Sequence, residues 1–486
     1  MSKELLSLEP KLLWENFYKL TCIPRPSKKE AETVKFVVDF GKKNNLETII
    51  DTAGNVIVRK PASKGFENRR GIIMQAHLDM VPQKNSDTTH DFEKDPINAY
   101  IDGEWVKAKG TTLGADNGIG VAAALAVMES TDLVHGPIEA LFTIDEEAGM
   151  TGAKNIQPAV LQGNILLNLD SEDEGELYVG CAGGSDATAV FTFKQENIPN
   201  DAIAFELALT GLKGGHSGLD IPLGRGNANK IMFRFLKNVV ANHGVRLSTI
   251  NGGSLRNAIP REAFAIVTVP KENEKEFLET LNDFSDILKL ELGKTEPNLN
   301  FIAKKVELPK FIMDEVSQDD LINAVQACPN GVIRMSNDME NLVETSLNLA
   351  IVESVDNKVV IKALLRSSVD TAKDDVESTL ESLFRLAGAE IKFSGQYPGW
   401  KPNMDSPILK TMQEVYQNKF GKIPEIRAIH AGLECGILGS AYPGWDMISF
   451  GPTIRFPHSP DEKVNIETVK LFWEYLVETL KNAPVK

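Results

Sequence analysis

The sequence lacks closely spaced cysteine pairs. Its 486 residues include four cysteines, which are scattered along the chain at Cys22, Cys181, Cys328 and Cys435. Neither a disulfide framework nor a thiolate zinc site is indicated, and a reducing cytoplasm is the expected compartment. Cys435 could be a nucleophile, but its neighbours match no cysteine-enzyme signature. A small buried residue is the favoured interpretation at that position.

Long apolar runs and an excess of basic residues are also missing. No stretch approaches the roughly 20 apolar residues that a membrane-spanning helix needs. Residues 1–17 alternate charged and apolar side chains, so we expect a helix there and not a signal peptide. Lys and Arg number 52 against 68 Asp and Glu, a net charge of -16. This balance disfavours nucleic acid and anionic membranes as main partners.

The chain does contain enough apolar sequence for more than one core. Hydrophobic residues make up 42% and charged residues 25%, which is ordinary for a globular protein, and the length suggests two or more domains. Near the N-terminus, short strand-like runs alternate with helical spacing, which predicts an α/β domain with a helix-covered mixed sheet. The strand-like runs are 55–58, 72–76, 138–144 and 165–169, and the helical patterns are 29–44 and 118–129.

A different pattern follows in the middle of the chain. From about residue 202 to 396, amphipathic strands alternate with amphipathic helices, which predicts a separate α+β domain made of two tandem strand-helix units. The last 90 or so residues return to the α/β pattern but have little core of their own. We therefore predict one domain from residues 1–186 and 397–486, with an inserted domain at 187–396.

Adjacent carboxylates at Glu146 and Glu147 are the strongest functional signal. They follow Asp145 at the end of the apolar run 138–144, where dense negative charge is costly unless a cation balances it. A pair of metal ions is our hypothesis. Neighbouring residues at a strand end point in different directions, so one carboxylate can bind metal while the other holds a proton.

Four further ligand-type residues stand at or beyond strand-like runs: His77, Asp116, Asp170 and His458. The carboxyl ends of strands in an open α/β sheet share one crevice, so these side chains are expected to converge. Each alone has an ordinary alternative: Asp116 could be a helix N-cap and His458 a loop histidine. Together they suit zinc or its first-row neighbours.

Asp79 lies two residues after His77. A metal-bound imidazole needs an acceptor for the proton on its second nitrogen, and a carboxylate at this spacing can reach back to supply it. We predict that supporting function for Asp79; a salt bridge to Lys or Arg is the alternative.

Motifs along nearly the whole chain resemble one group of enzymes, the dinuclear zinc peptidase clan that includes carnosinases, aminoacylases and peptidase T. Within the clan, the chain is similar to the bacterial aminoacyl-histidine (Xaa-His) dipeptidases. The motifs are, in order, QAHLDMVPQKN, GTTLGADNGIG, DEEAGMTGA, NLDSEDEGELYVGCAGG, LKGGHSGLDI, NGGSLRNAIPRE, HAGLECG and GPTIRFPHSPDE.

The resemblance implies two zinc ions per subunit, with cobalt or manganese as substitutes. It assigns His77 and Asp170 to one ion, Glu147 and His458 to the other, and Asp116 to both. It also implies a cis peptide bond between Asp116 and Asn117, and it matches Glu146 to the general base that activates the attacking water.

The same resemblance implies that the inserted domain is a lid that also dimerises. It selects His216 to stabilise the oxyanion, Asn257, Arg366 to bind the terminal carboxylate of a dipeptide, and Gly432 as a backbone contact. His216 could serve its own chain or the partner subunit of a homodimer, and the functions of His430 and Glu434 stay open.

The implied activity is hydrolysis of Xaa-His dipeptides, of the β-alanyl-histidine type, and of related unblocked dipeptides. Members of the same clan include N-acyl amino acid deacylases and tripeptidases, which share the metal residues and differ in how they bind the substrate's amino terminus. A zinc-binding scaffold without activity is the alternative of another class. Degraded ligand or base positions would favour it, and the sequence has none.

Overall fold

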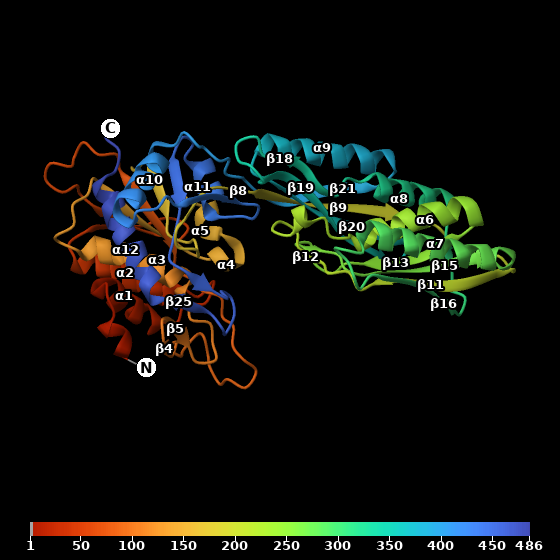
Figure 1. The fold of residues 1–486 in the computed structure, drawn as a ribbon, viewed down its shortest axis with the longest axis horizontal. Coiled ribbons are helices and arrows are strands. Elements are labelled where there is room, and N and C mark those ends of the chain that lie inside the picture. Colours follow the sequence, from red (N-terminus) through yellow and green to blue (C-terminus); the bar gives the residue numbers. More distant parts are fainter. Residues whose placement is uncertain (1–2) are drawn as a thin grey trace. The chain divides into compact units, whose positions relative to one another are not determined.

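The computed structural model describes residues 3–486, which form two compact units. The first unit contains the chain up to Cys181 together with Pro402–Ala428 and Leu433–Lys486, and the second contains Ala182–Lys401 and Ile429–Gly432. Figure 1 shows the N-terminal elements in red to yellow and the C-terminal elements α10 to α12 in blue within the first unit, and the green elements in the second. The catalytic and lid functions that we assigned to residues 1–186 with 397–486 and to 187–396 stay predictions.

The first unit is built on an eight-stranded mixed sheet in the order β1-β2-β6-β3-β7-β23-β8-β22. Strands β6, β3, β7 and β23 are parallel neighbours, while β1, β2 and β8 join the sheet antiparallel. A separate four-stranded sheet runs β24-β25-β5-β4. The strands are β1 (Glu47–Ile50), β2 (Val56–Lys60), β3 (Ile72–His77), β4 (Ala99–Asp102), β5 (Trp105–Ala108), β6 (Ile138–Thr143), β7 (Ile165–Asn168), β8 (Glu176–Cys181), β22 (Glu425–Ile429), β23 (Asp446–Ser449), β24 (Ile454–Arg455) and β25 (Lys463–Asn465).

Helices complete the first unit. They are η1 (Lys3–Ser7), α1 (Lys11–Thr21), α2 (Ala31–Lys43), α3 (Ala115–Glu129), α4 (Glu146–Gly149), α5 (Thr151–Lys154), α10 (Pro407–Phe420), α11 (Glu434–Ala441) and α12 (Ile466–Lys481). Every residue of β3, β6 and β7 is buried, as expected for parallel strands covered on both faces. Continuous apolar runs therefore formed these strands, as the sequence predicts.

The second unit has its own sheet, in the order β16-β11-β15-β13-β19-β20-β9-β21, with β18 paired to β19. The two predicted tandem halves thus contribute to one sheet. Its strands are β9 (Gly183–Thr192), β11 (Ala202–Thr210), β13 (Arg246–Gly252), β15 (Ala263–Pro270), β16 (Asn300–Val306), β18 (Gly331–Met335), β19 (Val343–Val355), β20 (Lys358–Ser367) and β21 (Glu390–Tyr397); short pairs are β10 (Gln195–Glu196) with β17 (Ile312–Met313) and β12 (Gly215–His216) with β14 (Ala258–Ile259).

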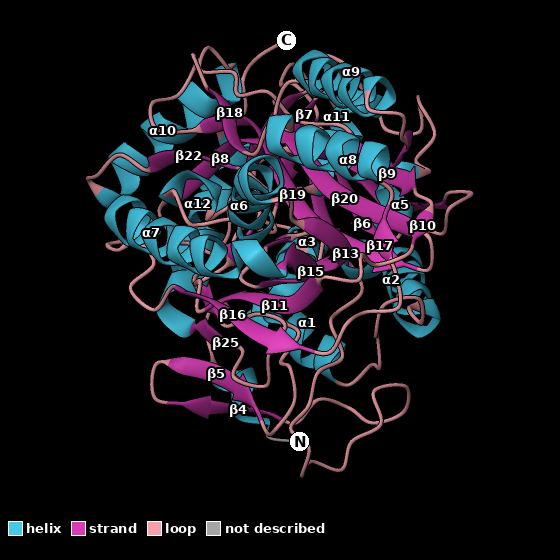
Figure 2. Ribbon diagram, turned by 90° about the vertical axis from the view of Figure 1, so that its right-hand side faces the viewer, coloured by secondary structure: helices cyan, strands magenta, loops and turns pink. Residues whose placement is uncertain are grey.

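Four long helices gather on one face of this second sheet (Figure 2). They are α6 (Ala228–His243), α7 (Glu274–Leu292), α8 (Glu315–Ala327) and α9 (Asp370–Leu386); η2 (Ile221–Leu223) and η3 (Lys271–Asn273) are short 3-10 turns. Their apolar faces pack with alternate strand residues into one core that includes Phe205, Phe235 and Phe277. The mixed α/β unit and the α+β unit together confirm the predicted fold class.

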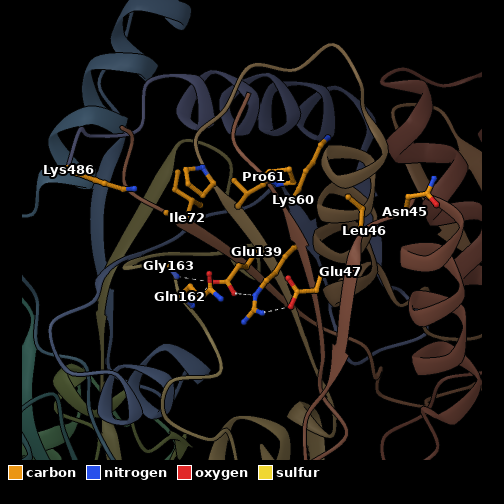
Figure 3. A pocket seen from close by; sticks show the side chains of 14 residues that line it. Asn45, Leu46, Glu47, Lys60, Pro61, Ile72, Glu139, Gln162, Gly163 and Lys486 are labelled. Atoms are coloured by element: carbon orange, nitrogen blue, oxygen red, sulfur yellow. Dashed lines mark hydrogen bonds and ion pairs between the residues drawn. The ribbon is translucent and has the colours of Figure 1, made fainter. Parts of the chain in front are cut away.

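A cavity of about 400 Å³ lies at the amino ends of β3 and β6, opposite the ends from which the predicted ligands extend (Figure 3). Three of its charged groups pair with one another: Arg59 binds Glu139 at 2.9 Å and Glu47 at 2.7 Å. Glu139 also accepts hydrogen bonds from the amides of Gln162 and Gly163. This cavity therefore has the character of a structural ion-pair network. Across residues 3–486, no helix is long and apolar enough to cross a membrane.

Candidate metal centre and substrate-binding residues

Strand ends deliver the predicted metal ligands to one place in the first unit. His77 is the last residue of β3, Asp170 lies two residues beyond β7, and Glu147 is in α4 just after β6. His458 lies in the loop after β24, and Asp116 is at the start of α3. The Asp116–Asn117 peptide bond is cis, as the resemblance implies. The structure thus brings together all five residues that the sequence nominates.

Asp116 lies between the two imidazoles. His77 Nε2 is 3.1 Å from one carboxylate oxygen of Asp116, and His458 Nε2 is 3.2 Å from the other. His77 Nε2 is also 3.4 Å from Asp170, and His458 Nε2 is 3.0 Å from Glu147. Two groups result, each with an imidazole and a carboxylate of its own, and they share Asp116. Within each group the possible ligand atoms lie within 4.8 Å of one another.

The charges in this cluster are strongly coupled. Burial opposes ionisation of Asp116, but hydrogen bonds to His458 and His77 lower its pKa below the ordinary value. Burial raises the pKa of Asp170 to about 6. Hydrogen bonds to Asp116 and Glu147 raise the pKa of His458 to about 11. Burial opposes protonation of His77 as well, yet Asp170 and the other carboxylates raise its pKa well above the ordinary value. The carboxylates therefore favour positive charge at both imidazoles.

The residues present fit metal ions. Glu147 Oε1 is buried and has no hydrogen-bond partner within residues 3–486, so one ligand-type oxygen is left unsatisfied. An orphaned carboxylate oxygen is expensive in a protein and calls for a donor or a cation. The donor set of imidazole nitrogens and carboxylate oxygens suits zinc and its first-row neighbours. These residues can therefore hold metal ions.

Asp79 supports both sides of the cluster. One oxygen accepts the backbone N–H of Glu146 at 3.0 Å and the other accepts that of Glu147 at 3.1 Å. The first oxygen is also 3.4 Å from His77 Nδ1, although the backbone carbonyl of Asp79 lies nearer to that nitrogen, at 3.2 Å. Burial opposes ionisation of Asp79, but the interactions with His77 and the amide of Glu146 lower its pKa to about 2. Asp79 therefore links the imidazole to the start of α4.

Glu146 shares α4 with Glu147 but differs in its environment. Burial raises the pKa of Glu146 well above its ordinary value, and nearby carboxylates such as Asp170 add to this effect. One of its carboxylate oxygens lies within 4.8 Å of the possible ligand atoms of His77 and Glu147. A buried carboxylate beside a cluster of ligand-type side chains is suited to proton transfer.

Two charged residues that sequence reasoning missed hold the backbone around this cluster. Arg25 is buried and donates hydrogen bonds to the carbonyls of Leu78, Asp79 and Gly114. Glu462 is also buried, and its carboxylate accepts the four consecutive backbone N–H groups from residue 113 to 116. Their partners are backbone atoms, so no side-chain pattern marks them. The motif PHSPDE contains Glu462, which is the one sequence signal that could have found it.

The predicted substrate contacts lie in the second unit. His216 pairs with Ala258 across the β12–β14 ladder, which places it beside Asn257, whose carbonyl accepts the N–H of Ser217. Arg366 is buried on β20 and donates to Ser217 Oγ at 3.4 Å and to the Tyr397 hydroxyl at 3.2 Å. A side chain at Gly432 would come within 3.0 Å of the Tyr397 ring. The structure thus gathers His216, Asn257, Arg366 and Gly432 around Ser217 and Tyr397, which sequence reasoning did not select.

The hydrogen bonds of His216 define its tautomer. Its Nδ1 accepts the backbone N–H groups of Gly218 at 3.2 Å and Leu219 at 3.0 Å, so the ring proton must be on Nε2. Burial lowers the pKa of His216, and the charge of Arg366 lowers it further. A neutral imidazole that carries its proton on Nε2 is suited to stabilise a developing oxyanion.

His430 belongs to the same group. Its Nε2 lies 2.7 Å from Ser346 Oγ, and burial together with the charge of Arg366 lowers its pKa to about 3. The imidazole of His430 is therefore neutral.

Comparison with known proteins decides the family. The model of peptidase family M20/M25/M40 matches residues 73–482. The chain belongs to this peptidase family. This M20 peptidase is 50% identical over 483 residues to the cytosol non-specific dipeptidase of Escherichia coli (strain K12), covering 99% of this chain and 100% of that protein.

Solved structures agree. The crystal structure of aminoacylhistidine dipeptidase from Vibrio alginolyticus superposes with a TM-score of 0.97 at 51% identity, covering 100% of this chain and 99% of that one. Aminopeptidase PepT from Bacillus cereus ATCC 10987 shares the fold, with a TM-score of 0.58 at 16% identity over 98% of this chain and 99% of the other. The predicted family resemblance and the prediction of a peptidase are confirmed.

Proposed function

We propose that this M20 peptidase is a metal-dependent dipeptidase that hydrolyses unblocked dipeptides, Xaa-His dipeptides such as β-alanyl-histidine included. The observation that carries the proposal is the pair of ligand groups that share Asp116 beside Glu146. The names of two relatives support it: one is called a non-specific dipeptidase and the other an aminoacylhistidine dipeptidase. A broad dipeptide range that includes Xaa-His fits both.

Zinc is the proposed metal, with two ions per subunit and cobalt or manganese as substitutes. His77 and Asp170 would hold one ion, Glu147 and His458 the other, and Asp116 both. Metal ions in such a site lower the pKa of bound water and polarise the scissile carbonyl.

Glu146 is the proposed general base. Its raised pKa lets it take the proton of the attacking water and then donate that proton to the departing amine. Asp79 holds the N–H groups of Glu146 and Glu147, so it would keep the base and the neighbouring ligand in fixed relation.

Substrate contacts are assigned to the second unit. Arg366, with its planar fork of donors, would bind the terminal carboxylate, and His216 would donate its Nε2–H to the oxyanion. Asn257 and the backbone at Gly432 would contact the rest of the dipeptide. We propose the second unit as lid and dimerisation domain of a cytoplasmic homodimer; the word cytosol in the name of the Escherichia coli relative supports the location.

A substrate panel tests the activity. Zinc-loaded protein is assayed with β-alanyl-histidine, other unblocked dipeptides, a tripeptide and N-acetyl amino acids, before and after removal of metal by a chelator. We expect the dipeptides to be cleaved, the activity to vanish with the metal, and zinc to restore it. Cleavage of N-acetyl amino acids alone would favour a deacylase, and a preference for the tripeptide would favour a tripeptidase. Metal binding without any hydrolysis would indicate a scaffold.

A further inference from the structure

A continuous line of buried polar side chains crosses the first sheet directly beneath the metal ligands. It comprises Thr143 on β6, Gln75 on β3, Asn168 on β7 and Ser449 on β23, and it ends at Glu434, the first residue of α11. All five side chains are between 0% and 2% exposed. Polar groups in the centre of a parallel sheet are costly unless each is paired, and apolar residues would fill the same space.

The hydrogen bonds of this line are short and continuous. Ser449 donates to Asn168 at 2.5 Å, Asn168 donates to Gln75 at 2.5 Å, and Gln75 donates to Glu434 Oε2 at 2.6 Å. Thr143 donates to the same oxygen at 2.7 Å. At the far end, Ser171 Oγ lies 2.6 Å from Ser449 Oγ. We call this set, from Ser171 to Glu434 and including Thr143, the polar line.

Strand register places Gln75, Asn168 and Ser449 one step below the ligands, whereas Thr143 is paired with His77 itself. Gln75 is paired with Asn168, and Asn168 with Ser449, so these three side chains stand side by side. Gln75 precedes His77 by two residues and therefore points to the same face of β3. Asn168 precedes Asp170 by two residues, and Ser171 directly follows Asp170. The polar line thus connects the strands that carry His77, Asp170 and the Glu146–Glu147 pair.

One acceptor gives the line its direction. Glu434 Oε2 only accepts here, so Gln75 must present its amide nitrogen to it and its amide oxygen to Asn168. Asn168 must then present its own oxygen to Ser449, and Ser171 must donate to Ser449. Without the acceptor at Glu434, both amides could reverse, and the orientation of the polar side chains beneath the metal ligands would no longer be specified.

We propose that Glu434 is a positioning residue that, through the polar line, fixes the side chains on which the metal ligands rest. The inference rests on the proposed metal-dependent function and adds a function for Glu434 that the family motif leaves open. The property that matters is an acceptor at the Oε2 position and not the negative charge, because the position accepts two hydrogen bonds and forms no ion pair in the described chain. The carboxamide of Glu434→Gln keeps such an acceptor, whereas Glu434→Leu removes it.

Cobalt binding tests the proposal without relying on hydrolysis. Metal-free native protein and the variants E434Q, E434L, T143V and T479V are titrated with Co²⁺, and the affinity and the visible absorption spectrum are recorded. T479V is the matched control for T143V: both threonines are fully buried, but Thr479 is outside the polar line. Circular dichroism checks that each variant folds. If E434L does not fold, the isosteric variant T143V still tests the proposal.

We expect E434L to bind cobalt about tenfold or more weakly with an altered spectrum, T143V to weaken binding about threefold or more, and E434Q and T479V to match the native protein. Native affinity and spectrum in E434L or T143V would overturn the proposal, as would a loss in E434Q as large as in E434L. A loss in T479V equal to that in T143V would overturn it too. If the native protein binds cobalt but cleaves no dipeptide, the proposed function is refuted instead. The comparison of cobalt binding among the variants would still test the proposal for Glu434.

Discussion

Asp116 faces a different imidazole with each of its carboxylate oxygens, and this determines how the centre responds to pH. Without metal, hydrogen bonds to Asp116 and Glu147 raise the pKa of His458 to about 11, and the carboxylates around His77 raise its pKa too, so protonation of both rings is favoured. A metal ion binds only the neutral imidazole and must displace these protons. Proton and metal therefore compete for the same nitrogens.

We predict that metal affinity rises with pH. Between pH 6 and 8 each ion displaces at least one proton, so the apparent affinity should increase about tenfold per pH unit. Deprotonation of Asp170, whose pKa is about 6, acts in the same direction. Competition with a chromophoric chelator at several pH values, with proton release measured in weak buffer, checks this. An affinity independent of pH would show that the metal does not displace protons from the histidines.

Arg366 provides a second prediction for a single residue. Its guanidinium already spans Ser217 and Tyr397, and its fork of donors matches a carboxylate in two places at once. Arg366→Lys keeps the charge but not the fork, so KM for a dipeptide should rise about tenfold or more, with a smaller change in kcat. The matching dipeptide amide, which lacks the terminal carboxylate, is the control substrate. An equal rise in KM for the amide would show that Arg366 does not bind the terminal carboxylate.

At the scale of the element, the turn into α3 depends on Glu462. The four N–H groups from residue 113 to 116 point at one buried carboxylate, which accepts them at 2.7 to 3.2 Å. Removal of that carboxylate leaves buried donors unpaired and frees Asp116, the proposed ligand that both groups share.

Glu462→Ala should therefore lower the free energy of unfolding by about 2 kcal/mol or more and weaken metal binding as well. Glu462→Gln retains one amide oxygen as acceptor and should fall between the native protein and Glu462→Ala. Thermal unfolding of metal-free and metal-loaded samples measures both effects. If Glu462→Ala matched the native protein in stability and affinity, the carboxylate would have no part in holding the turn.

The secondary-structure elements that have a clear local pattern are the part of the fold that the sequence could predict. Continuous apolar runs predicted β3, β6 and β7, and the polar residues just after those runs predicted His77, Glu146, Glu147 and Asp170. The shared carboxyl edge of parallel strands predicted that they would converge. These inferences needed only local pattern and one rule of topology.

The supporting residues could not be predicted in the same way. Arg25 and Glu462 bind backbone atoms of distant segments, and Glu434 meets Gln75 and Thr143 only after α11 packs against the sheet. Their local sequence reads as an ordinary loop arginine or helix-start glutamate. Contacts of this kind depend on tertiary packing, and no local pattern or periodicity in a single sequence predicts them.

For the whole molecule, the proposed homodimer has a direct test. A chain of 53.4 kDa should sediment with about twice that mass at micromolar concentration. The prediction follows from the family resemblance, which assigns dimerisation to the inserted domain. Sedimentation velocity over a hundredfold range of concentration measures the mass and any dissociation. A mass of one chain throughout that range would contradict the homodimer.

The division of labour between Glu146 and Glu147 is the central claim about the molecule, and one substitution tests it most directly. Glu146→Gln preserves the shape of the side chain but removes its ability to take a proton. The zinc content and dipeptidase activity of this variant are compared with those of the native protein. We expect two zinc ions per chain in both, and a loss of kcat by about two to four orders of magnitude in the variant. Turnover close to that of the native enzyme would contradict the assignment of Glu146 as the base.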